Sequence, residues 1–260
     1  MYITANERSS TFGQAPAPVR APCPPRSCTP VGSFLPSRHG FNFINSFTTT
    51  ISLPSPLPTI SPTYGLCGGM ASAALDYFLS CIPRPSTATV PPSGSTLFNY
   101  LFRRLLDSLG APVFGMVAKF LSWTNRPDIT TGGIVPGTSI GTIDGVQELT
   151  APEFRATIAS LSAARPVVLG LIYVGPGAVD IWQNHQVLAY SKTVVRPTVT
   201  DIRVYDPNYP GVDDAVIRCE VLAGGSRVRC QELLPSRGVT KRVRGFFRMP
   251  YTKMIPPCLP

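Results

Sequence analysis

The sequence predicts an α+β domain in which helices come first and an antiparallel β-sheet follows. Up to residue 165, apolar residues recur with helical spacing, and Pro or Gly residues separate the segments. Beyond that point the chain becomes rich in Val, Ile and Tyr, which favour strands. Helices followed by strands are typical of α+β domains with an antiparallel sheet. The expected strands are residues 166–174, 184–195, 198–206, 212–222 and 238–249.

The 260-residue chain is expected to have two regions. Residues 1–37 are rich in Pro, Ser, Ala and Arg, and such a composition buries too little apolar surface to offset its ordering entropy. We therefore expect a flexible N-terminal segment. Residues 38–260 form the folded domain and are enough to bury a sizeable core. Within it, the alternation of aromatic and polar residues over 40–47 predicts a short half-buried strand.

The first two helices have clear signals at their ends. One helix is expected from Cys67 to just before Pro83, because proline interrupts helical hydrogen bonding. The second is expected over residues 95–109, with Ser95 as the N-cap and Gly110 as the C-terminal stop.

Two further helices are expected before the sheet, over residues 112–123 and 152–165. Pro152 would lie in the first turn of the later helix, where a missing N–H is tolerated. The Gly- and Thr-rich residues 125–145 are predicted to form a long loop, and loops of that length are often functional.

The charge pattern does not favour nucleic acid as a partner. The formal net charge is +9, but the basic residues are scattered except over 227–248, where they alternate with apolar residues as on the solvated face of strands. No apolar run is long enough to span a bilayer, and the first residues lack the apolar core of a signal peptide. We expect a soluble protein that is cytoplasmic, or exported without a cleavable signal peptide.

The seven cysteines show neither a C-x-x-C pair nor a Cys/His zinc spacing. We therefore expect no metal site, and no motif calls for a cofactor. The odd number leaves at least one thiol unpaired in a monomer. Pairs such as Cys23 with Cys28, or Cys219 with Cys230, stay open at the level of sequence.

Cys67 is the first candidate for a reactive side chain. It lies in the segment Tyr-Gly-Leu-Cys-Gly-Gly-Met, residues 64–70, directly before an apolar helical pattern. A helix N-terminus carries unpaired N–H groups and a partial positive charge, which together stabilise a thiolate. The glycines at 68 and 69 allow another chain to approach the sulfur closely. The alternative is a buried structural cysteine, a common place for a free thiol.

A thiol nucleophile needs a base and a group that orients the base. His185 begins an apolar strand, and Asp206 ends the next one, just before Pro207. Neighbouring antiparallel strands would bring the two side chains close together, because cross-strand neighbours lie about 5 Å apart. Taken separately, His185 also fits a structural histidine, and Asp206 fits a residue of a turn.

Three motifs in this order resemble the papain-like cysteine peptidase superfamily, in the branch that includes bacteriocin-processing peptidases. They are G-x-C-G-G-M at a helix start, N-H-x-V-x-x-Y at residues 184–190, and Y-D-P-N-x-P-G at residues 205–211. The resemblance extends over about residues 39–215. It implies Cys67 as nucleophile, His185 as general base and acid, and Asp206 as the residue that orients the imidazole. Asn208 is a second candidate for the orienting role.

The chain departs from this superfamily at the oxyanion hole. A Gln a few residues before the nucleophile usually donates to the oxyanion there, whereas Ser61 occupies the corresponding distance here. The backbone N–H of Cys67 can supply one donor. The side chain of Asn45 or of Asn42 is expected to supply the second.

The resemblance implies a papain-like fold, with helices packed on a C-terminal antiparallel sheet, and a protein or peptide substrate. The expected reaction is cleavage of a peptide or isopeptide bond through a thioester at Cys67. The same three residues would also serve a glutamine deamidase, a transglutaminase or an acyltransferase, including a toxin or effector domain, because each of these forms a thioester. A non-catalytic binding module on the same fold is the third possibility. The oligomeric state stays open.

Overall fold

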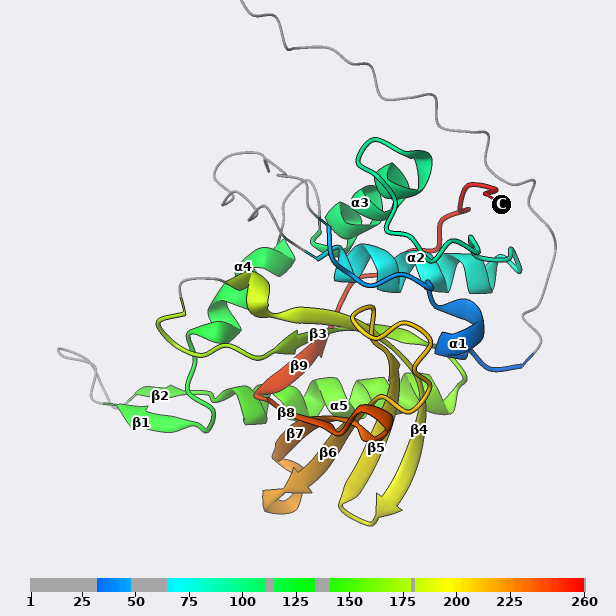
Figure 1. The fold of residues 1–260 in the computed structure, drawn as a ribbon. Helices are drawn as coiled ribbons and strands as arrows, with labels where there is room; N and C mark the ends of the chain where they lie inside the picture. Colours follow the sequence, from blue (N-terminus) through cyan, green and yellow to red (C-terminus); the bar gives the residue numbers. More distant parts are fainter. Residues whose placement is uncertain (1–31, 48–64, 111–114, 134–140, 179–180, 260) are drawn as a thin grey trace, which may run out of the picture.

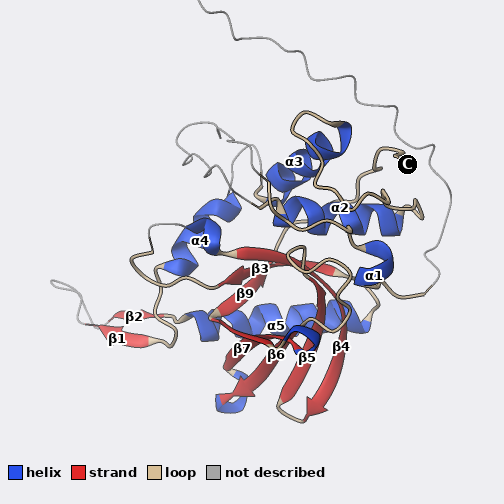
Figure 2. Cartoon of the chain, viewed as in Figure 1, coloured by secondary structure: helices blue, strands red, loops and turns tan. Residues whose placement is uncertain are grey.

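The fold is organised around a curled sheet of seven strands, all antiparallel, with helices on both faces (Figure 1). The computed structural model describes residues 32–47, 65–110, 115–133, 141–178 and 181–259. Three helices, α2, α3 and α4, lie on one side of the sheet, and the long helix α5 lies on the other (Figure 2). The protein is thus an α+β protein, as its sequence predicts.

The helices are α1 (Pro36–His39), α2 (Cys67–Leu79), α3 (Thr96–Ser108), α4 (Gly115–Thr124) and α5 (Val146–Ser162). The strands of the main sheet are β3 (Val167–Ile172), β4 (His185–Arg196), β5 (Val199–Tyr205), β6 (Val216–Leu222), β7 (Arg227–Leu234), β8 (Val239–Val243) and β9 (Gly245–Arg248). A separate small hairpin consists of β1 (Thr131–Gly133) and β2 (Gly141–Ile143). Short 3-10 helices cover Ile181–Gln183, Ala223–Gly225 and Pro235–Arg237.

The order of the strands requires the sheet to curl. The order is β8-β7-β6-β5-β4-β3-β9, so β8 and β9 lie at opposite edges. In the chain, however, only Arg244 separates them. The two edges must therefore approach each other at this residue, and the sheet bends around the face that holds α5.

Each face of the sheet has its own hydrophobic core. On β4, Leu188 and Tyr190 pack with α2, whereas Val187 and Ala189 pack with α5. This division follows from the alternation of side chains along a strand. The first residue of the same strand, His185, has the parity of Val187 and so faces the inside of the curl. Its neighbour Gln186 faces α2.

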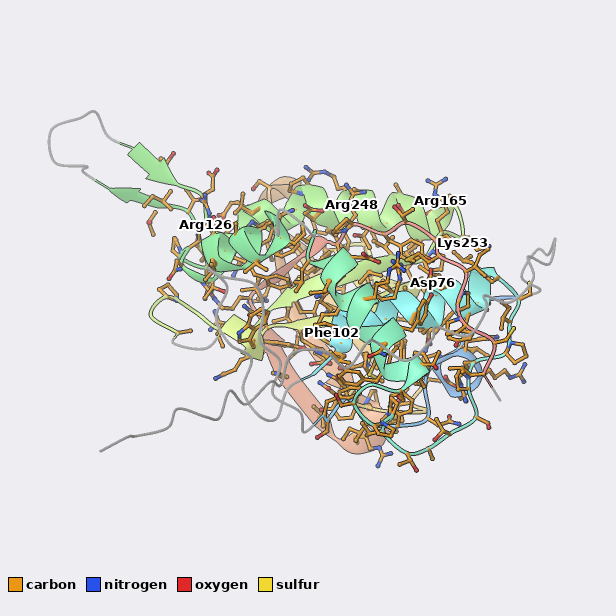
Figure 3. The ribbon with its side chains drawn as sticks, turned by 90° about the horizontal axis from the view of Figure 1, so that it is seen from above. Asp76, Phe102, Arg126, Arg165, Arg248 and Lys253 are labelled. Carbon is orange, nitrogen blue, oxygen red and sulfur yellow. The ribbon has the colours of Figure 1, made fainter. Side chains whose placement is uncertain are left out.

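Helix α2 is almost entirely buried, because its small residues allow α3 to approach closely. A Cβ on Gly69 would overlap the carbonyl oxygen of Leu101 in α3. Asp76, further along α2, accepts hydrogen bonds from Tyr100 (2.7 Å) and Tyr251 (2.8 Å) and pairs with Arg104. Figure 3 shows Asp76 beside the C-terminal segment, so this buried carboxylate holds that segment to the helices.

The structure corrects two boundaries that were predicted from sequence. Helix α5 begins at Val146 instead of residue 152, so Pro152 lies in its interior. The loop before the helix supports the first turn, since Val146 N donates to Pro127 O (2.9 Å). The folded region also begins before residue 38, because Phe34 is only 1% exposed and packs against Tyr190. Residues 1–31 of the predicted flexible segment lie outside the described residues.

Other predictions are met to different degrees. Ser95 caps α3 as predicted, accepting from Phe98 N at 3.3 Å. The strand β7 was not among the expected strand ranges, although the charge pattern over 227–248 indicated strands there. The segment 238–249 is divided into two strands by Arg244. Residues 40–47 keep the predicted alternation of buried and exposed side chains but form no regular strand.

The described cysteines fall into two groups. Cys81 and Cys258 each take part in a disulfide bond. Cys67, Cys219 and Cys230 are free thiols, and the sulfurs of Cys219 and Cys230 lie 3.9 Å apart. Cys23 and Cys28 lie outside the described residues. No helix in the described part of the chain is long and apolar enough to cross a membrane.

Candidate active site

Cys67 is the first residue of α2 and is half-buried. No side chain caps this helix end, so its first N–H groups remain available to a negative charge at the sulfur or at a bound substrate. The small Gly68 is needed beside it, because a Cβ there would overlap the amide of Gln186. The close approach of β4 to the start of α2 thus places the thiol at the end of the strand that begins with His185.

His185 and Asp206 meet at one end of the β4–β5 hairpin. The pairing of β4 with β5 ends at Leu188 and Tyr205. His185 precedes Leu188 and Asp206 follows Tyr205, so both lie at this end of the hairpin. His185 Nε2 lies 2.7 Å from Asp206 Oδ1. Both side chains are buried, at 7% and 2% exposure for the residues. The other ring nitrogen, Nδ1, is left for the sulfur of Cys67, which lies close enough to the imidazole to help raise the pKa of His185.

The charges of the site support a protonated imidazole. Burial disfavours the charged form of His185, but the carboxylate of Asp206 and the sulfur of Cys67 outweigh it and hold the pKa of His185 well above its usual value. Burial also disfavours the Asp206 carboxylate. The imidazolium and the backbone N–H of Asn208, at 2.8 Å, nevertheless keep the pKa of Asp206 below its usual value. The arrangement therefore favours an imidazolium paired with the Asp206 carboxylate.

The structure brings Cys67, His185 and Asp206 together and separates the two candidate oxyanion donors. Asn45 packs against Gly65, two residues before Cys67, and its Nδ2 donates to Asn208 Oδ1 at 3.0 Å.

Asn42 lies elsewhere. Its Oδ1 accepts from Arg84 (2.6 Å), and its Nδ2 donates to the carbonyl of Ser86 (3.3 Å). These contacts place Asn42 away from the loop before Cys67, and we do not retain it as an oxyanion donor.

Asn208 is close to the imidazole but is not its nearest partner. Its Nδ2 lies 3.3 Å from His185 Nε2, compared with 2.7 Å for Asp206 Oδ1. The nearer carboxylate therefore takes the Nε2 proton. Asn208 instead links the histidine side of the site to Asn45.

Three polar residues around the site were not predicted from the sequence. Gln186 is buried against the start of α2. Tyr173 stacks on the His185 ring, with centroids 6.5 Å apart and an interplanar angle of 27°. Glu232 is buried on β7 and acts electrostatically on Asp206. Of these three residues, only Glu232 could have been noticed in the sequence, because it shares the strand face of the apolar residues Val228, Cys230 and Leu234.

No family model matches this chain, and neither a curated protein nor a solved structure matches it. Among the described residues, no group of His, Cys, Asp or Glu side chains could hold a metal ion. The chemistry of the site must therefore be inferred from its geometry.

Proposed function

We propose that this protein is a cysteine-dependent hydrolase with a papain-like arrangement, which cleaves a peptide or isopeptide bond through a thioester at Cys67. The observation that carries the proposal is the meeting of Cys67, His185 and Asp206, which come from a helix start and from two strands far away in the sequence. A half-exposed thiol, a buried imidazole and a buried carboxylate beside one another are the groups that nucleophilic catalysis by a cysteine requires.

Each residue has a defined role in the proposed reaction. The Cys67 thiolate attacks the substrate carbonyl and forms a C–S bond, and the imidazolium of His185 gives its Nδ1 proton to the leaving amine. Water then attacks the thioester and His185 takes up the proton of that water, while the C–S bond breaks to release the acid product and restore the Cys67 thiolate. Asp206 holds the Nε2 proton throughout, so the ring keeps one tautomer and one orientation.

The oxyanion is proposed to form between the backbone N–H of Cys67 and the side chain of Asn45. The first N–H groups of α2 point to the position where the negative charge would develop. Asn45 supports this role by its place beside Gly65, and its Nδ2 keeps a second hydrogen after donating to Asn208.

Alkylation with iodoacetamide, followed by tryptic mapping, tests the nucleophile. We expect Cys67 to react much faster than Cys219 and Cys230 at neutral pH, and His185→Ala to abolish the difference between Cys67 and an ordinary exposed thiol. Burial alone slows the alkylation of Cys219 and Cys230. The rate of Cys67 in His185→Ala, compared with the wild type, therefore decides whether the imidazole activates the thiol. Equal rates for Cys67 in the wild type and in this variant would exclude an activated thiol.

The acyl acceptor is tested separately, by mass spectrometry of candidate protein substrates. Chain cleavage is expected. A mass increase of about one unit without cleavage would instead indicate deamidation, and a larger increase would indicate transfer to an amine, by the same thioester chemistry.

A further inference from the structure

Glu232 is a carboxyl group in a position that should be apolar. It lies on β7, where Val228, Cys230 and Leu234 face the core of the curled sheet, and it is 2% exposed. A buried charge is unfavourable unless it is paired or hydrogen-bonded. Its surroundings should therefore show how its two oxygens are satisfied.

Only one of the two oxygens has an ordinary donor. Glu232 Oε2 accepts from the hydroxyl of Tyr173 at 2.7 Å. Oε1 is buried and has no N–H or O–H donor. The carboxyl of Asp206 lies within hydrogen-bonding reach of Glu232, and two ionised carboxylates have no hydrogen to share. A proton on Glu232 would supply the missing hydrogen bond.

The same tyrosine connects Glu232 to the imidazole from a second side. The ring of Tyr173 stacks on that of His185, while its hydroxyl is bound to Glu232. Glu232 thus interacts with two neighbours of His185: Asp206, whose carboxylate orients the imidazole, and Tyr173, whose ring stacks on it.

We propose that Glu232 is a positioning residue of this site, a protonated carboxyl that donates a hydrogen bond to Asp206 and holds its carboxylate against His185. This role rests on the proposed function, in which His185 is the base that Asp206 orients. Loss of the Glu232 proton removes the hydrogen bond and places a second negative charge beside Asp206, so the same residue makes the site sensitive to pH.

The electrostatics agree with a proton on Glu232 up to neutral pH. Burial, followed by the charge of Asp206, raises the pKa of Glu232 from 4.5 to about 7. Below about pH 7 the carboxyl is protonated and donates, and above it the carboxyl is ionised and repels Asp206. The hydrogen bond from Tyr173 and the charge of His185 act in the opposite direction and keep the pKa from rising further.

The other titratable groups near Glu232 come from the neighbouring elements. On β8, its Cα partner is Lys241, whose Nζ lies 3.4 Å from the centroid of the Tyr173 ring. Tyr209, after β5, is close enough for Glu232 to raise its pKa, after burial and Asp206. On β6, the Cα partner is the apolar Ile217.

The charged residues of α5 bind groups elsewhere. Glu148 accepts from Thr130 N (3.2 Å), Glu153 pairs with Lys119 (2.9 Å), and Arg155 donates to the carbonyl of Gly225 (3.0 Å). After burial, Asp206, Tyr173 and His185 are therefore the groups that act on Glu232.

NMR titration of the imidazole tests the proposal without requiring a substrate or an active thiol. The chain has two histidines, so a His39→Gln variant assigns the signals of His185. We expect the wild-type signals to shift with an inflection near the pKa of Glu232. In Glu232→Gln, which keeps a donor but cannot ionise, this inflection should vanish. His185 should then deprotonate at a lower pH, because the second negative charge cannot form.

Tyr173→Phe distinguishes this role from simple packing. The variant keeps the stacked ring but removes the hydroxyl that stabilises ionised Glu232, so the inflection should move to higher pH. Glu220→Gln, at a half-buried position of β6 paired with Arg229, is the control and should leave the curve unchanged. A His185 titration in Glu232→Gln identical to that of the wild type would overturn the proposal.

The rate of Cys67 alkylation provides a second measurement. Glu232→Leu, which has neither donor nor charge, should react about tenfold more slowly at neutral pH, the factor expected for one lost hydrogen bond to a charged group. Glu232→Gln should remain close to the wild type below neutral pH. If Cys67 proves unreactive in the wild type, the proposed function fails, while the imidazole titration still decides the coupling to Glu232.

Discussion

Two side chains compete for the same nitrogen of His185. Asp206 Oδ1 and Asn208 Nδ2 lie 2.7 Å and 3.3 Å from Nε2, and the order of distances assigns the proton to the carboxylate. The carboxylate also balances the charge of a buried imidazolium, which an amide cannot do. Asn208 nevertheless occupies a position from which it could orient the ring if the carboxylate were lost.

Replacing each of these residues should separate their roles. We expect Asp206→Asn to lower the rate of Cys67 alkylation at neutral pH by about 10²-fold or more, the range of a lost general base. Asn208→Ala should lower it by less than about tenfold, as for one neutral hydrogen bond. Circular dichroism of both variants controls for folding. A larger loss in Asn208→Ala than in Asp206→Asn would assign the orienting role to the amide.

At the scale of elements, the position of Cys67 depends on how closely α2 can pack. Gly68 lies against Gln186 of β4, and Gly69 lies against Leu101 and Leu105 of α3. The two consecutive glycines thus allow two neighbours to approach the first turn of the helix from different sides. The Gly-Gly pair is therefore a packing requirement as well as part of the proposed active site.

Gly69→Ala should destabilise the protein through this contact. The added Cβ would overlap the Leu101 carbonyl oxygen and lie 2.9 Å from its carbonyl carbon, and both are backbone atoms that cannot move aside alone. We expect a loss of about 1–3 kcal/mol in the free energy of unfolding, measured by urea denaturation. Gly115→Ala in α4, where the added Cβ meets nothing within 4 Å, is the control. It should be neutral or stabilising by up to about 1 kcal/mol, and equal effects of the two changes would contradict the packing argument.

At the scale of the whole molecule, Arg244 joins the two edges of the sheet. It is 8% exposed, and its guanidinium binds Asp128 (2.5 Å), the carbonyls of Thr124 (3.0 Å) and Val174 (2.7 Å), and that of Arg126. Its backbone N–H donates to Ile172 O at 2.8 Å. One residue therefore ties the edges of the sheet to the segment between α4 and β1.

Arg244→Met should weaken the contact between the two edges of the sheet and destabilise the protein. The change leaves buried carbonyls without a donor and removes the charge that faces Asp128, for which we expect a loss of about 3 kcal/mol or more in unfolding free energy. Arg229→Met removes an exposed arginine paired with Glu220 and should cost at most about 1 kcal/mol. Urea denaturation of both variants measures the difference, and a loss below about 1 kcal/mol in Arg244→Met would show that the sheet closes without it.

The parts that could be predicted from sequence are those governed by local patterns. The periods of helices and strands predict the α+β class and the start of α2 at Cys67, and the chemistry of Ser95 predicts the cap of α3. Pro152 shows the limit of such signals. A proline favours a first turn locally, but here hydrogen bonds from the preceding loop extend the helix upstream of it.

The sequence motifs identify Cys67, His185 and Asp206 as candidate site residues. Which side chains surround them depends on the tertiary structure alone. Asn45 and Asn42 are equivalent in the sequence, and only the packing of their segment puts one beside Gly65 and the other beside Arg84. Glu232 could not be predicted as a neighbour of Asp206, because only the curl of the sheet brings this part of β7 to the end of β5. Local patterns determine which way a side chain points along its own strand. Its partner depends on register and curvature, which are properties of the whole folded chain.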